Sequence, residues 1–84
     1  MNGPAETRLA QRLDLRGLDP PEPMQRALEA VEALGHGGVL EVITDRDPLL
    51  LYRELARRGH PYASESRSDG FHTTIRRPEG ESAP

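Results

Sequence analysis

Prolines and glycines divide this chain into short segments, and each segment has its own hydrophobic period. Leu13 and Leu15 alternate with charged residues, and a period of two indicates a half-buried strand, which Gly17 ends. The three prolines within residues 20–23 suit the first turn of a helix, where a missing N–H leaves no bond unmade. The glycine-rich stretch at residues 35–38 ends that helix.

Two further elements follow from the same reasoning. Residues 39–44 are almost continuously apolar and β-branched, which predicts a central strand. Asp47 as N-cap and Pro48 as first helical residue predict a second helix, which Gly59 ends. The apolar face of the first helix comprises Met24, Ala27, Leu28, Val31 and Leu34, and the buried stripe of the second comprises Leu51, Tyr52, Leu55 and Ala56. Because three consecutive leucines cover too wide an arc for one buried face, we expect Leu49 or Leu50 to be exposed or covered by a partner.

The last segment, residues 60–77, holds two extended runs separated by Ser68-Asp69-Gly70, which predicts a hairpin. The order is then β-α-β-α-β-β, and a right-handed crossover makes the first two strands parallel. We therefore predict an α+β two-layer sandwich, in which a four-stranded mixed sheet carries two helices on one face. A single domain is expected at residues 11–77, with flexible tails at residues 1–10 and 78–84. Leu13, Leu15, Leu40, Val42, Phe71 and Ile75 are expected to face the helices, and Asp14, Arg16, Glu41, His72 and Arg76 the open side.

Composition excludes several classes of function. The 84 residues include no cysteine, so disulfides, thiolate nucleophiles and cysteine-ligated metals are ruled out. No apolar run approaches the ~20 residues of a membrane helix, and we expect a cytoplasmic domain without membrane contact. A net charge of -3 argues against broad nucleic-acid binding. Only three aromatic residues are present, and at least two of them are expected in the core.

A resemblance to a known family rests on residues 13–24, the amphipathic helix that follows, Gly37-Gly38, a hydrophobic strand, and Asp45-Arg-Asp-Pro48. Over roughly residues 12–77 this pattern resembles the TusA/SirA-like sulfur-carrier family. It is most similar to a cysteine-less branch described as a domain of unknown function, DUF2249. The resemblance implies a two-layer α/β sandwich, which agrees with the element order derived above.

The reactive motif of that family is Cys-Pro-X-Pro, whose cysteine carries a persulfide at the start of a helix. Here Pro21-Glu22-Pro23 supplies Pro-X-Pro, and Pro20 stands where the cysteine would be. A helix N-terminus lowers the pKa of a thiol, and proline has no group that could respond. The carrier function is not carried over, and we predict no catalytic residue and no cofactor. The resemblance implies a role near sulfur or nitrogen-oxide metabolism, where such domains also occur beside hemerythrin-like partners.

The topology places three segments at one end of the fold: the loops at residues 17–23 and 44–48 and the hairpin tip at residues 67–70. This is the end where the parallel strands finish, and ligands of open α/β sheets favour the carboxyl ends of strands. We predict a non-catalytic site there for an unknown protein partner or a small anionic ligand, formed by Arg16, Asp19, Glu22, Arg46 and Arg67. In a purely structural alternative, the aspartates cap helices and turns and the arginines pair with them. Two further alternatives are an RNA-binding module, based on arginines of the second helix and last strand, and a metal-dependent or acid/base site formed by Glu22, Asp45, Asp47 and His72.

Overall fold

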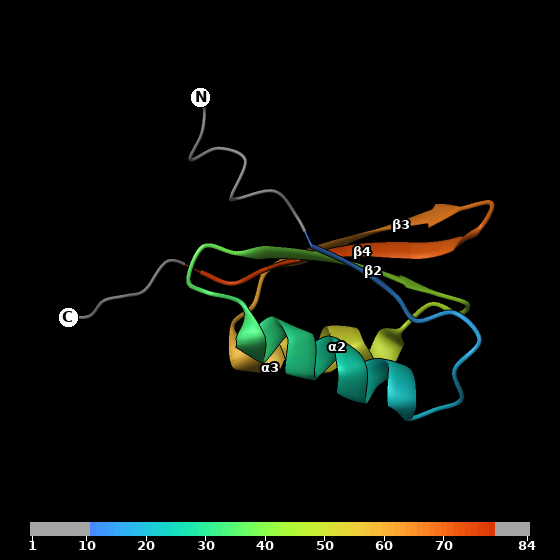
Figure 1. Ribbon diagram of the computed structural model, residues 1–84, viewed down its shortest axis with the longest axis horizontal. Coiled ribbons are helices and arrows are strands. Elements are labelled where there is room, and N and C mark those ends of the chain that lie inside the picture. Colours follow the sequence, from blue (N-terminus) through green and yellow to red (C-terminus); the bar gives the residue numbers. More distant parts are fainter. Residues whose placement is uncertain (1–10, 79–84) are drawn as a thin grey trace.

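The computed structural model describes residues 11–78, which form a sheet packed on a layer of two helices (Figure 1). The elements are β1 (Gln11–Asp14), α2 (Glu22–Ala33), β2 (Val39–Thr44), α3 (Leu49–Arg58), β3 (Tyr62–Arg67) and β4 (Gly70–Arg76). This order confirms the predicted α+β sandwich. The tails expected at residues 1–10 and 78–84 lie outside the described residues, apart from Pro78. Within residues 11–78, no helix has the length and apolarity needed to cross a membrane.

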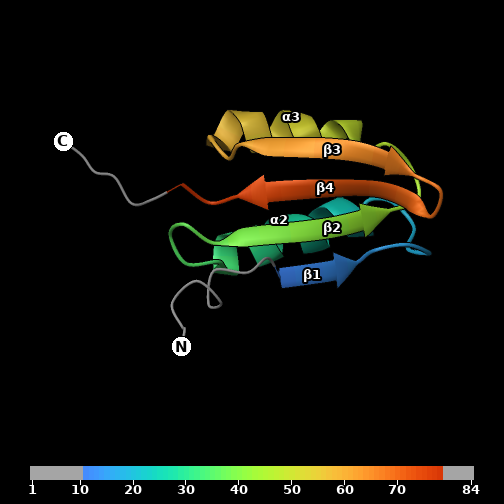
Figure 2. The same ribbon diagram turned by 90° about the horizontal axis from the view of Figure 1, so that it is seen from above.

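The four strands lie in the order β1-β2-β4-β3 (Figure 2). β1 runs parallel to β2, as the crossover rule predicts, and β4 pairs antiparallel with both β2 and β3. The hairpin predicted at Ser68-Asp69-Gly70 is present, with Arg67 opposite Gly70 at its end. β4 therefore lies inside the sheet although it is the last strand in the described residues, and β1 and β3 form the edges.

The register of the strands decides which side chains face the helices. Leu40 lies opposite Ile75 and Val42 opposite Thr73, and directly opposed residues share a face of the sheet. The helix-facing side chains join α2 and α3 in one core comprising Leu15, Ala27, Val31, Leu34, Leu40, Val42, Leu51, Leu55 and Ile75. The same register places Glu41, His72 and Arg76 on the open face, as expected.

Both helices begin slightly later than the sequence indicates. α2 starts at Glu22, and Pro20 and Pro21 belong to the turn before it, which the N–H of Glu22 closes by donating to the backbone oxygen of Asp19 at 2.9 Å. α3 starts at Leu49, so Pro48 occupies the cap position. Asp47 uses its backbone oxygen, which accepts from the N–H of Leu49 at 2.9 Å, and no side chain caps the helix. The expected Asp47 side-chain cap is therefore wrong.

The aromatic residues are less buried than expected. Tyr52 is half-buried and stacks on Tyr62 of β3, with ring centroids 4.9 Å apart and an interplanar angle of 5°. Tyr62 is 40% exposed and Phe71 is half-buried, so the expectation of two core aromatics is wrong. Ala56 is exposed as well, because Leu51 and Leu55, four residues apart, already fill the face that α3 turns to the sheet. The buried stripe of α3 is narrower than predicted.

Candidate functional site

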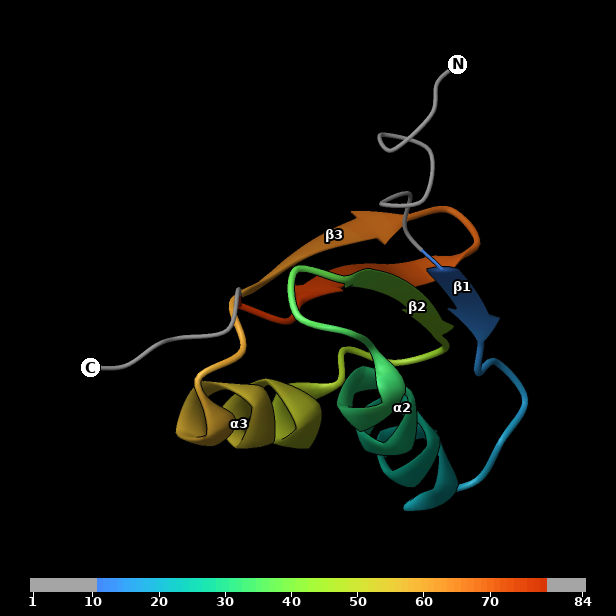
Figure 3. The same ribbon diagram turned by 60° about the vertical axis from the view of Figure 1, so that its left-hand side comes forward.

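Two loops and the β3–β4 turn meet at the end of the molecule where both helices begin (Figure 3). Asp45, just after β2, joins the two loops, since its Oδ2 accepts a hydrogen bond from the backbone N–H of Gly17 at 2.6 Å. Gly17 has a φ of 84°, a conformation that glycine adopts without strain. Arg16 reaches the turn, where its Nη1 donates to the backbone oxygen of Asp69 at 3.2 Å. The predicted meeting of the three segments is confirmed.

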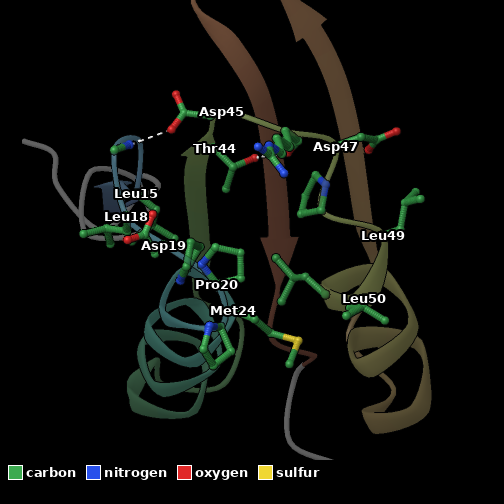
Figure 4. Close-up of a pocket in the computed structure, with 16 residues that line it drawn as sticks. Leu15, Leu18, Asp19, Pro20, Met24, Thr44, Asp45, Asp47, Leu49 and Leu50 are labelled. Atoms are coloured by element: carbon green, nitrogen blue, oxygen red, sulfur yellow. Dashed lines mark hydrogen bonds between the residues drawn. The ribbon is translucent and has the colours of Figure 1, made fainter.

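A cleft of about 630 Å³ opens at this end, between the N-terminal parts of α2 and α3 (Figure 4). Its size lies in the range of small-ligand sites, about 300–1,000 Å³. Pro20 and Met24 line it on the side of α2, and Leu49 and Leu50 on the side of α3. Proline rings, leucine side chains and a thioether make most of this lining apolar.

The leucines at the start of α3 are exposed. Leu49 is 64% and Leu50 is 62% exposed, whereas Leu51, the next residue, is 2% exposed and belongs to the core. Exposure of Leu49 or Leu50 was predicted from the width of the leucine run, and the structure exposes both. Together with the apolar lining of the cleft, these two leucines form a continuous exposed apolar surface, the kind of feature that marks interaction or ligand-binding sites.

The structure divides the five predicted site residues between different surfaces. Asp19 and Arg46 line the cleft. Glu22 lies in a shallow depression alongside α2, where it forms an ion pair with Arg26 at 2.8 Å. Asp19 borders that depression as well as the cleft, so it lies between the two surfaces.

The other two, Arg16 and Arg67, bind acidic neighbours in the sequence. The Arg16 guanidinium contacts Asp14 at 2.7 Å and holds the pKa of that carboxyl at about 2. Arg67 contacts Glu65 at 3.1 Å, and the hydrogen bond raises the pKa of the arginine above its usual value. Both arginines therefore fit the structural alternative, in which arginines pair with nearby acids.

His72 is the centre of a polar cluster on the open face of the sheet. Its Nδ1 lies 3.0 Å from Glu41 and its Nε2 lies 2.8 Å from Asp69, and Arg12 contacts the same Glu41 at 3.0 Å. These side chains cover the ring, which is only 5% exposed. The hydrogen bonds to Asp69 and Glu41 raise the pKa of His72, and the His72 ring lowers the pKa of both carboxyls.

This cluster predicts a pH-dependent stability. A raised histidine pKa stabilises the folded state fully below about pH 6.5, and the contribution disappears as the pH rises through the raised value. We expect the free energy of unfolding of the wild type to fall between about pH 6 and pH 9, and this fall to be absent in His72→Gln. Denaturant titrations across that pH range measure it. His36→Gln, at an exposed histidine, is the control and should keep the wild-type profile; a fall that survives in His72→Gln would contradict the assignment.

The four residues of the alternative metal or acid/base site do not form one cluster, although Asp45 and Asp47 both line the cleft. Both ring nitrogens of His72 face Glu41 and Asp69, while Glu22 pairs with Arg26 and Asp45 binds the Gly17 N–H. Within residues 11–78, no group of three or more histidine, aspartate or glutamate side chains is arranged to hold a metal ion.

Known proteins show the same fold and sequence pattern. Residues 12–77 match the model of a family described as an uncharacterized conserved protein, DUF2249. The chain belongs to this family. Its fold is similar to the crystal structure of a SirA-like protein from Desulfitobacterium hafniense, with 29% sequence identity and a TM-score of 0.73 over 81% of this chain and 97% of that chain. No curated protein matches the chain significantly.

Membership of the DUF2249 family confirms the resemblance drawn from the sequence. In the structure, Pro20 lines the cleft. The predicted site residues are all charged, so the prediction missed the apolar residues Leu18 and Met24, which line the cleft. The available signal was the run Leu49–Leu51, whose width already indicated an apolar surface without a cover.

Proposed function

We propose that this DUF2249 domain is a recognition module, which binds a partner protein or small ligand in the cleft and carries out no covalent chemistry on it. The observation that carries the proposal is the exposure of Leu49 and Leu50 at 64% and 62% on the wall of the cleft. Leaving two leucines in water forgoes stabilisation of about 1.5–3 kcal/mol for each side chain on full burial. A bound molecule that covers the two leucines would recover part of this free energy.

Pro20 supports a role in binding without transfer. In the sulfur-carrier pattern this position holds the persulfide-forming cysteine, and here it presents a proline ring to the cleft. The corner between β1 and α2, residues 15–21, contains no thiol or hydroxyl side chain. The resemblance of the sequence to the sulfur-carrier family directs the search for partners to proteins of sulfur or nitrogen-oxide metabolism.

Titration with a neutral apolar probe, N-phenyl-1-naphthylamine, followed by amide NMR, tests the proposal. We expect saturable binding that shifts the amides of Leu18, Met24 and Leu49–Leu51, because these residues line the cleft. An uncharged probe separates burial of apolar surface from charge. Shifts confined to the opposite end, around Gly37 and Gly59, or no binding at all would overturn the assignment of the site.

A further inference from the structure

We infer that the natural occupant of the cleft is an apolar segment of a partner protein that carries arginine or lysine beside its apolar side chains. This inference rests on the proposed function and adds the chemical class of the partner. Its basis is the combination of an apolar wall with an acidic lining.

The apolar part of the surface lies on both helices. Met24 is half-buried on α2, while Leu49 and Leu50 extend into solvent from the first turn of α3 (Figure 4). α3 cannot bury them itself, because successive residues of a helix point about 100° apart and Leu51 already faces the core. Apolar side chains of another molecule would bury the exposed parts of Leu49 and Leu50.

The charged part of the lining is mainly acidic. Asp19, Asp45 and Asp47 line the cleft, and Arg46 is the single basic residue among its lining residues. Asp45 contributes one oxygen to the Gly17 N–H, while Asp19 and Asp47 form no salt bridge within residues 11–78. The N-termini of α2 and α3 add partial positive charges of about half a unit each, so a net negative charge remains.

The net negative charge of the cleft lining favours a cationic occupant over an anionic one. A small anion would lie beside three aspartates and one arginine, which is unfavourable, whereas a cationic side chain beside an apolar one satisfies both parts of the surface. A second copy of this chain is the competing occupant, since Arg53 follows Leu49 and Leu50 by one turn on α3. The experiment therefore has to distinguish self-association from binding of a partner segment.

Two synthetic amphipathic peptides with identical leucine positions test the inference, one with arginine and one with glutamate at every charged position. We expect the arginine peptide to shift the amides of Met24, Leu49 and Leu50 and to bind at least about fivefold more tightly than the glutamate peptide. Asp19→Asn and Asp47→Asn should each weaken the arginine peptide about two- to fivefold. Glu65→Gln, which removes a carboxylate on edge strand β3 far from the cleft lining, is the matched control and should bind like the wild type.

Each contrary outcome has its own meaning. Equal or tighter binding of the glutamate peptide would overturn the charge assignment and leave the proposed function intact. If neither peptide nor the neutral naphthylamine probe bound, the proposed function itself would fail. If the amides of Leu49 and Leu50 shifted on dilution of the protein alone, the occupant would be a second copy of the chain, and the inference of a basic partner segment would be wrong.

Discussion

Leu55→Ala is expected to lower the free energy of unfolding by about 2–5 kcal/mol. Leu55 lies on α3, is fully buried, and contributes to the core between the helices and the sheet. Truncation leaves a cavity that its neighbours fill only in part. Because small domains have total stabilities of about 5–15 kcal/mol, the loss would be a large fraction of the whole. Denaturant unfolding monitored by circular dichroism measures it.

Leu50→Ala is the matched control for this prediction. It removes the same atoms from the same helix at a side chain that is 62% exposed, and we expect a change of no more than about 0.5 kcal/mol. Similar losses for the two variants would show that the burial assigned to α3 is wrong.

Gly70→Ala is expected to cost about 2–5 kcal/mol, which combines a strained backbone with a steric overlap. Gly70 opens β4 after the hairpin turn with a φ of 141°, and a Cβ atom there would lie 2.6 Å from the backbone oxygen of Thr44. The oxygen belongs to the backbone and the position of the Cβ atom is fixed by it, so the turn would have to move away from the end of β2. The midpoint of chemical denaturation reports the loss.

Gly17→Ala separates the two contributions. Gly17 also has a positive φ, of 84°, but a Cβ atom there would meet nothing within 4 Å. We therefore expect only the conformational cost of about 1–2 kcal/mol. If Gly17→Ala destabilised the domain as much as Gly70→Ala, close packing of the turn against Thr44 would not be the cause.

The helices and strands could be predicted because local rules decide them. Gly59 ends α3 in the left-handed conformation, with a φ of 79°, as expected of a glycine after a helix. The β-branched run at residues 39–44 forms β2 with the predicted bounds. The Ser68-Asp69-Gly70 signal produces the hairpin. In each case the residues of a short stretch of chain determine the local structure.

Burial and capping depend on neighbours that the sequence does not place. His72 was expected on the open face, and it is there, yet Glu41 and Asp69 cover it so that it is 5% exposed. Tyr52 is half-buried and stacks on Tyr62 of the edge strand β3, a contact between segments that the sequence alone does not bring together. These outcomes follow from strand order and side-chain packing.

The meeting of the loops was predicted from the sequence, whereas the side chains that line the cleft were not. The fold brings the loops after β1 and β2 together, because both helices return from the same end of the sheet. All five predicted site residues are charged, and two of them, Arg16 and Arg67, pair with acids two residues away. Apolar lining residues such as Leu18 and Met24 are indistinguishable from core residues until the packing is known.

The affinity of a Leu49→Gln, Leu50→Gln double variant for N-phenyl-1-naphthylamine, compared with that of Ala56→Gln, tests the role of the cleft most directly. Glutamine keeps a helix propensity similar to that of leucine, and all three positions are exposed on α3. We expect the double variant to bind at least about tenfold more weakly, with a free energy of unfolding within about 0.5 kcal/mol of the wild type, and Ala56→Gln to bind normally. Unchanged binding by a folded double variant would contradict a recognition site at Leu49 and Leu50.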